Sequence, residues 1–179
     1  MRILIISPHV PTRHCGVADH IAIQVRELAK RKHRISILTG IENTKKKVLI
    51  DNANILPLIK KWDFRAFFGL RTAIKVFNPD VIHIHYQISM YDGKSFITIV
   101  PFLIKIFGRK MRTVVTLHDL NPPYLFPKAG MLRKIFVYFL AKYSDAVIVS
   151  NALDYQDTSS IMKCNTGVIK ENDFYLYAA

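Results

Sequence analysis

Short, continuous apolar runs alternate along this chain with longer segments whose apolar residues recur every three or four positions. The runs are rich in Ile, Val and Leu, as strands buried on both faces are. The clearest of them occupy residues 2–6, 34–38, 81–85, 113–117 and 146–149. The alternation predicts an α/β fold with a doubly wound, mainly parallel, Rossmann-like sheet.

Helical periodicity fills the segments between these runs. In residues 17–32, Val17, Ile21, Val25 and Leu28 form one apolar stripe opposite charged residues. The other expected helices occupy residues 63–77, 95–107 and 131–142, and Asp63 can cap the first of these. A further strand is expected at residues 54–58, although Pro57 cannot complete a central hydrogen-bond ladder.

The pattern fades after residue 149. Residues 40–47, with three consecutive lysines, are expected to form a solvated loop, and Ser150 or Asn151 could cap a short helix that ends near residue 163. Neither helical nor alternating periodicity follows. We therefore expect one domain over residues 1–163 and an irregular tail over residues 164–179.

The composition adds a strong positive charge to this picture. The 179 residues include 26 Lys and Arg against 13 Asp and Glu, a formal net charge of +13. This charge attracts lipid head groups, nucleic acid or phosphorylated small molecules. We expect no nucleic acid partner, because no RNA-binding motif or aromatic stacking platform organises the basic residues. Residues 96–112 and 131–142 join aromatic bulk to Lys and Arg, which suits either a helix on anionic lipid or a sheet-covering helix with a solvated basic face.

Cysteine usage and hydropathy bear on location. Cys15 and Cys164 are too few for a disulfide framework and belong to no CxxC pair, which favours a reducing compartment. No signal peptide pattern begins the chain, and the longest apolar stretch, residues 96–107, is shorter than the ~20 residues that cross a bilayer. We expect a cytoplasmic protein, with peripheral attachment to the inner face of the membrane as an option.

Polar side chains follow three of the expected strands. Ser7 and His9, on either side of Pro8, follow the strand at residues 2–6. His85, Tyr86 and Gln87 lie around the end of the strand at residues 81–85, and His118 and Asp119 follow the strand at residues 113–117. In an open parallel sheet the ligand crevice lies beyond the carboxyl ends of the strands, so these residues are expected to converge there. The sequence therefore predicts one side of an active-site cleft.

Gly16 lies between the first strand and the first helix. A glycine there lets the backbone approach a ligand closely, and the following helix N-terminus suits a phosphate. A glycine that only the turn requires is an equally good interpretation. The sequence contains neither GxGxxG nor GxxxxGKS, so the dinucleotide fingerprint and the P-loop are both missing.

Histidines supply the other candidate chemistry. His83 and His85 point to one face of their strand, which could begin a metal site, but no further ligand follows at a suitable spacing. We therefore expect no metal, with His83 hydrogen-bonded in the core and His85 at the crevice. His118 could donate to a sugar hydroxyl or a phosphate with Asp119 orienting it, or it could simply fix the loop. For a Cys15 thiol nucleophile no partner can be identified from the sequence.

These residues together resemble the N-terminal domain of GT-B glycosyltransferases of family 4. The matching stretches are residues 1–8 with 15–20 (CGVADH), 79–87 (PDVIHIHYQ), 116–120 (TLHDL) and 144–150 (SDAVIVS). Each is short, but their order and spacing are specific, and the resemblance covers roughly residues 1–155. It implies a Rossmann-like acceptor domain that faces a second domain holding a nucleotide sugar.

The resemblance also implies roles for particular residues. Gly16 would approach the diphosphate of the donor, and His118, with Asp119, would act catalytically against the transferred sugar. His85, Tyr86 and Gln87 would line the acceptor side. Enzymes of this kind need no metal or other cofactor, because helix dipoles and basic side chains stabilise the departing nucleotide diphosphate.

The sequence departs from the family pattern in two respects. Cys15 precedes a single Gly16 where a glycine pair is commoner, and no second set of βα units or Glu-x7-Glu segment follows. The expected function is the acceptor side of a retaining glycosyltransferase acting on a glycolipid or polysaccharide, incomplete without a separate donor-binding domain or subunit. The alternative is a noncatalytic module of the same fold that binds a membrane surface or a partner.

Overall fold

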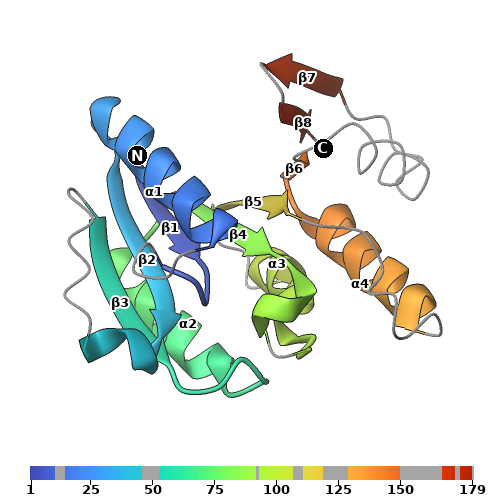
Figure 1. Cartoon of the computed structure of the whole chain (residues 1–179), viewed down its shortest axis with the longest axis horizontal. Coiled ribbons are helices and arrows are strands. Elements are labelled where there is room, and N and C mark those ends of the chain that lie inside the picture. Colours follow the sequence, from blue (N-terminus) through green and yellow to red (C-terminus); the bar gives the residue numbers. More distant parts are fainter. Residues whose placement is uncertain are drawn as a thin grey trace.

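A single twisted sheet forms the centre of the molecule (Figure 1). The structure is a computed structural model, and it describes residues 1–10, 15–45, 53–91, 93–106, 111–118, 129–149, 167–171 and 174–178. The strands are β1 (Arg2–Ile6), β2 (Arg34–Gly40), β3 (Ala53–Ile59), β4 (Val81–Tyr86), β5 (Arg112–Leu117), β6 (Ala146–Val149), β7 (Gly167–Glu171) and β8 (Phe174–Ala178). The helices are α1 (Gly16–Lys30), α2 (Ala66–Phe77), α3 (Phe96–Ile106) and α4 (Ala129–Tyr143), with short 3-10 turns η1 (Ile41–Lys45) and η2 (Ile88–Tyr91).

The strand order in the described part of the chain is β3-β2-β1-β4-β5-β6-β8-β7. All pairings from β3 to β6 are parallel, and β8 pairs antiparallel with both β6 and β7. The first six positions reproduce the 3-2-1-4-5-6 order of the Rossmann fold. The predicted doubly wound, mainly parallel α/β sheet is therefore confirmed.

The two faces of the sheet carry different helices. His83 pairs in register with Ile5, and this face is covered by α1, whose Gln24 bonds to His83. Ile6 and Leu38, which point the other way, meet Ala66 of α2 and Ile97 of α3 in the interior. Beside α3, α4 is held by the ring contact of Phe102 with Tyr143, with centroids 4.8 Å apart. Right-handed crossovers place α1 on one face and α2, α3 and α4 on the other. The reason is that the chain first moves along the sheet from β1 to β3 and then in the opposite direction to β4, β5 and β6.

Two aspartates tie neighbouring strands together at their amino ends. The Asp80 carboxylate, just before β4, accepts a 2.6 Å hydrogen bond from the backbone N–H of Arg2 at the start of β1. Asp145, just before β6, accepts in the same way from the N–H of Thr113 in β5 at 2.6 Å. The Arg2 hydrogen bonds lower the pKa of the Asp80 carboxyl. The repeated arrangement sets the position of β4 against β1 and of β6 against β5.

Most elements form where the pattern places them, with instructive differences at their ends. Pro57 is tolerated because β3 is the edge strand, where one side of the backbone needs no ladder partner. Helix α2 begins at Ala66, not at Asp63, whose carboxylate instead accepts from the N–H of Arg65 in the preceding turn. The stretch predicted as a solvated loop after β2 begins with the turn η1.

The prediction of an irregular tail was wrong for the residues of β7 and β8. The two strands pair antiparallel with each other, and β8 also pairs antiparallel with β6. The second partner of β8 is therefore distant in the sequence, where a local pattern does not indicate it. The short helix expected between residues 150 and 163 lies outside the described residues.

The core contains the apolar side chains of the parallel strands and of the inward faces of the helices. Leu4, Ile5, Ile37, Ile82 and Ile84 are fully buried. No helix in the described part of the chain has the length and hydropathy needed to span a membrane.

Candidate functional site

The sheet changes direction of winding between β1 and β4, which lie side by side at its centre. The connections that leave these two strands diverge to opposite faces, and open α/β sheets bind ligands beyond the carboxyl ends of the strands at such a point. Ser7 and His9 follow β1, Gln87 follows β4, and His118 follows β5. The residues predicted to converge therefore belong to one edge of the sheet.

A stack of histidine rings lies under this edge. His118 Nε2 and His85 Nδ1 are 2.8 Å apart, and the two rings stack with centroids separated by 5.1 Å. His83 continues the stack below His85 at 4.6 Å. From α1, His20 meets both His85 and His118 edge-on, at 5.6 and 5.2 Å. Residues from three elements thus form one aromatic, polar cluster.

Gln24, one turn after His20 on α1, connects the cluster through its amide. Its Oε1 lies 3.0 Å from His85 Nε2, and its Nε2 lies 3.2 Å from His83 Nδ1. The amide oxygen can only accept and the amide nitrogen can only donate, so both histidines carry their proton on Nε2. The Nε2–H of His83 donates a 2.7 Å hydrogen bond to Thr116 Oγ1.

This pattern also determines the state of His118. Because His85 Nδ1 has no proton, it accepts from His118 Nε2. In its neutral form His118 then has Nδ1 as a hydrogen-bond acceptor. One amide on α1 therefore fixes the tautomer of a histidine that follows β5.

Burial keeps these imidazoles neutral. Desolvation lowers the pKa of His83 to about 3, with smaller contributions from His20 and His118. The pKa of His118 falls to about 4, again mainly because of burial and then because of His20. Burial lowers the pKa of His85 well below its ordinary value and also lowers the pKa of His20. At neutral pH the cluster is an uncharged hydrogen-bond network.

Gly16 opens α1 at the same edge, one helical turn before His20. A Cβ added to Gly16 would meet no atom of the described residues within 4 Å, and its backbone does not adopt a positive φ. No side chain in the described residues caps this helix end. The turn therefore does not require a glycine. The open space and the uncapped N–H groups instead match the interpretation of a close approach to a ligand.

Cys15 and His9 lie beside this helix end. The Cys15 Sγ is 3.4 Å from His9 Nδ1, and Ser7 Oγ holds the His9 backbone by accepting from its N–H and donating to its C=O. The sequence had offered no partner for the Cys15 thiol. Its partner in the structure is His9, which comes from the other end of the same loop.

Two of the predicted acceptor-lining residues are buried. Tyr86 is only 2% exposed and points to the opposite face from His85, where it stacks with Tyr91 at 6.2 Å. Strand alternation places its side chain in the core. His85 is fully buried and contacts His118, which follows β5.

The remaining predicted residues have different outcomes. His83 is the buried, hydrogen-bonded residue that the sequence predicts. Gln87 is half-buried at the end of β4, and its C=O accepts from the N–H of Met90. Asp119, expected to orient His118, lies outside the described residues. Among the residues that the structure describes, no group of three His, Cys, Asp or Glu is arranged to hold a metal ion.

His20 and Gln24 belong to the cluster but were not predicted from the sequence. With Gly16 they form a series at i, i+4 and i+8 along one line of α1. His20 and Gln24 lie next to the buried Ile21 and Val25 on α1. This position could have indicated their role in the sequence, because polar side chains beside a buried stripe require hydrogen-bond partners.

Comparison with known proteins gives one family. The sequence model described as Glycosyltransferase Family 4 matches residues 15–153. A search of curated proteins finds no match to this chain.

Proposed function

This chain belongs to glycosyltransferase family 4, and we propose that it forms the acceptor-side domain of an enzyme that transfers a sugar from a nucleotide-sugar donor to a glycolipid or polysaccharide. One observation carries the proposal. The open N-terminus of α1 at Gly16 and the His118 imidazole lie at the same edge, connected by the ring contact of His20 with His118 at 5.2 Å.

The N-terminus of α1 would receive the diphosphate of the donor. Its first N–H groups point out of the helix, and the helix dipole places partial positive charge there. Since Gly16 has no side chain, phosphate oxygens can reach these groups directly. The same dipole, together with basic side chains, would stabilise the negative charge that develops on the departing nucleotide diphosphate.

His118 would position the transferred sugar. Held through Nε2 by His85, it offers Nδ1 to a sugar hydroxyl as a hydrogen-bond acceptor. The neutral state suits this role, because a charged imidazole would donate from both nitrogens. Asp119 is proposed beside it on the basis of the family resemblance alone.

The proposal includes a partner domain and a stereochemical outcome. A second Rossmann-like domain would hold the nucleotide and face this edge, and the reaction would retain the configuration of the transferred sugar. Gln87 would contribute to the acceptor side. These elements extend the family assignment and are open to direct measurement.

The test begins with nucleotide-sugar binding by the full chain mixed with a candidate donor-binding domain. A panel of uridine and guanosine diphosphate sugars is titrated while NMR follows the Gly16 amide and the His118 ring. We expect both signals to shift, and Gly16→Val and His118→Gln to weaken binding. Ile23→Ser, at an exposed position on α1, is the matched control. Shifts confined to other regions, or equal binding by all variants, would refute the proposed site.

Sugar transfer is measured separately. A labelled nucleotide sugar and a lipid or polysaccharide extract are incubated with the chain and a candidate donor-binding domain. Transfer that His118→Gln reduces supports the enzyme. Nucleotide-sugar binding with no transfer by any such combination would instead support a noncatalytic module.

A further inference from the structure

The two faces of the molecule differ sharply in the charge of their helices. Helix α1 carries Asp19 and Glu27 against Arg26 and Lys30. The sequences of α2, α3 and α4, on the opposite face, contain no Asp or Glu at all. Their cations are Arg71, Lys75, Lys105, Arg133, Lys134 and Lys142. The helices on one face therefore carry only basic charges, whereas the charges of α1 are balanced.

Large apolar side chains are exposed on the same basic face. Phe64 lies just before α2 and is 69% exposed, and Phe68 lies in the first turn of α2 and is 66% exposed. Val76 of α2 and Ile106 of α3 are exposed as well, as are Ile135, Tyr138 and Phe139 of α4. Exposed apolar residues that cluster among cations mark an interaction surface more often than a purely solvated one.

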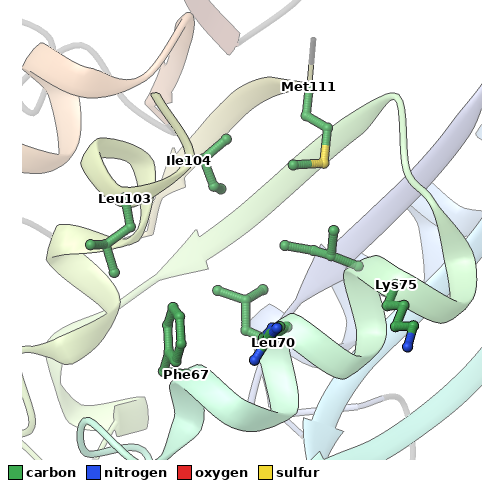
Figure 2. Close-up of a pocket in the computed structure, with 8 residues that line it drawn as sticks. Phe67, Leu70, Lys75, Leu103, Ile104 and Met111 are labelled. Atoms are coloured by element: carbon green, nitrogen blue, oxygen red, sulfur yellow. The ribbon is translucent and has the colours of Figure 1, made fainter. Parts of the chain in front are cut away.

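A groove runs between α2 and α3 on this face (Figure 2). Its volume is about 620 Å³, and its apolar lining consists of Phe67, Leu70, Ile74, Leu103, Ile104 and Met111. Figure 2 shows the side chains of Phe67 and Leu70 rising from α2 toward α3, while Lys75 projects outward. Arg71 and Lys75 complete the lining one helical turn apart on α2.

The two cations of the groove have no carboxylate partner in the described part of the chain. The ion pairs found there join Arg2 with Asp80 and Lys30 with Glu27, both away from α2. Arg71 and Lys75 are exposed on the helix surface. They are thus available to an anion from outside the described residues.

We propose that the groove between α2 and α3 is a docking site for the surface of an anionic phospholipid bilayer. Arg71 and Lys75 bind the phosphate of a head group, and the apolar groove accepts the upper part of an acyl chain. Phe64 and Phe68 insert beside it at the interface. Membrane surfaces attract this combination of cations and exposed aromatic residues.

The charges also argue against other occupants. A second copy of this chain would bring the basic helices α2, α3 and α4 of one molecule against those of another, and the like charges would repel. Nucleic acid favours aromatic rings set out for base stacking, whereas the groove is mainly aliphatic. The proposal does not depend on sugar transfer, because vesicle binding is measured without any donor or acceptor sugar.

The decisive experiment compares charge reversals on the two faces. The full chain is sedimented with phosphatidylglycerol-containing vesicles and with pure phosphatidylcholine vesicles. We expect binding to the anionic vesicles alone, weakening as salt rises. Arg71→Glu with Lys75→Glu should weaken it by about tenfold or more. Arg26→Glu with Arg31→Glu on the α1 side makes the same change in net charge and should weaken it much less.

A second pair of variants tests the apolar contribution. Phe68→Ser removes a side chain that is 66% exposed, and Ile23→Ser removes one that is 60% exposed on α1. Only the first should reduce vesicle binding, and circular dichroism melts check that all variants fold. Equal losses from both faces, or no binding to anionic vesicles, would overturn the proposal. Binding of an RNA oligonucleotide that depends on Arg71 and Lys75, without vesicle binding, would overturn it as well.

Discussion

The imidazoles of His85 and His118 share a 2.8 Å hydrogen bond and stack with an interplanar angle of 19°. They come from different strands, 33 residues apart in the sequence. His85 is fixed in turn by Gln24 of α1, so the orientation of His118 is set from beneath by buried groups. A loop residue at the proposed site is therefore held by the core of the sheet.

Gln24→Leu should destabilise the protein and disturb His118. The substitution leaves His83 Nδ1 and His85 Nε2 without partners inside the molecule, which typically costs about 1–3 kcal/mol. Urea denaturation measures the free energy of unfolding, and NMR of the imidazole nitrogens reports the tautomer of His118. Arg26→Gln, exposed on the same helix, is the control. Unchanged nitrogen spectra would show that Gln24 does not set the tautomer.

Stability should fall as the pH drops from about 6.5 toward 4. Burial depresses the pKa of His83 to about 3 in the folded protein, whereas the unfolded chain titrates near 6.5. Below pH 6.5 the unfolded state binds a proton at this histidine and the folded state does not. Each such histidine then lowers the free energy of unfolding by up to about 1.4 kcal/mol per pH unit. Above pH 6.5 this dependence should vanish.

The variant His83→Gln isolates the contribution of one histidine. The groups that surround His83 are His85 on β4, His20 and Gln24 on α1, and His118 after β5, and they remain in the variant. The plot of unfolding free energy against pH should therefore become shallower without becoming flat. An identical slope in the variant and the wild type would mean that His83 is protonated in the folded protein.

Tyr91→Phe should lower stability by about 1–2 kcal/mol, because it removes a buried hydrogen bond. The Tyr91 hydroxyl donates to the backbone C=O of His85 at 2.7 Å, and burial raises the pKa of Tyr91 well above its ordinary value. Thermal unfolding measures the loss. Tyr138→Phe, at a more exposed ring on α4, should change the melting temperature little.

Gly69→Ala should destabilise the protein even though alanine favours helices. A Cβ at Gly69 would lie 2.7 Å from the Leu58 carbonyl oxygen and 2.6 Å from Ile59 Cδ1, so α2 would have to move away from β3. Such overpacking costs about 1–3 kcal/mol. Gly16→Ala, where no atom lies within 4 Å, is the matched comparison in the same denaturation experiment. Equal stability of the two variants would contradict the close packing of α2 on β3.

The order of strands and helices follows from the sequence to a large extent. Residues 2–6 and 146–149 form strands within the predicted limits, and the helix predicted at 17–32 is α1. The tail is the exception, since β8 pairs with β6, which is distant in the sequence, as well as with its neighbour β7. Tyr86 illustrates a subtler point, because it follows His85 in the sequence yet faces the opposite side of the sheet.

The amino-acid sequence by itself determined the α/β class, the edge at which polar residues gather, and the basic charge, because periodicity, strand ends and composition are local properties. Only the tertiary structure decided that His85 lies beneath His118, that His20 and Gln24 complete the cluster, and that α2 and α3 enclose a groove. These relationships depend on register and desolvation between segments distant in the chain, and no local pattern encodes the distance between two side chains.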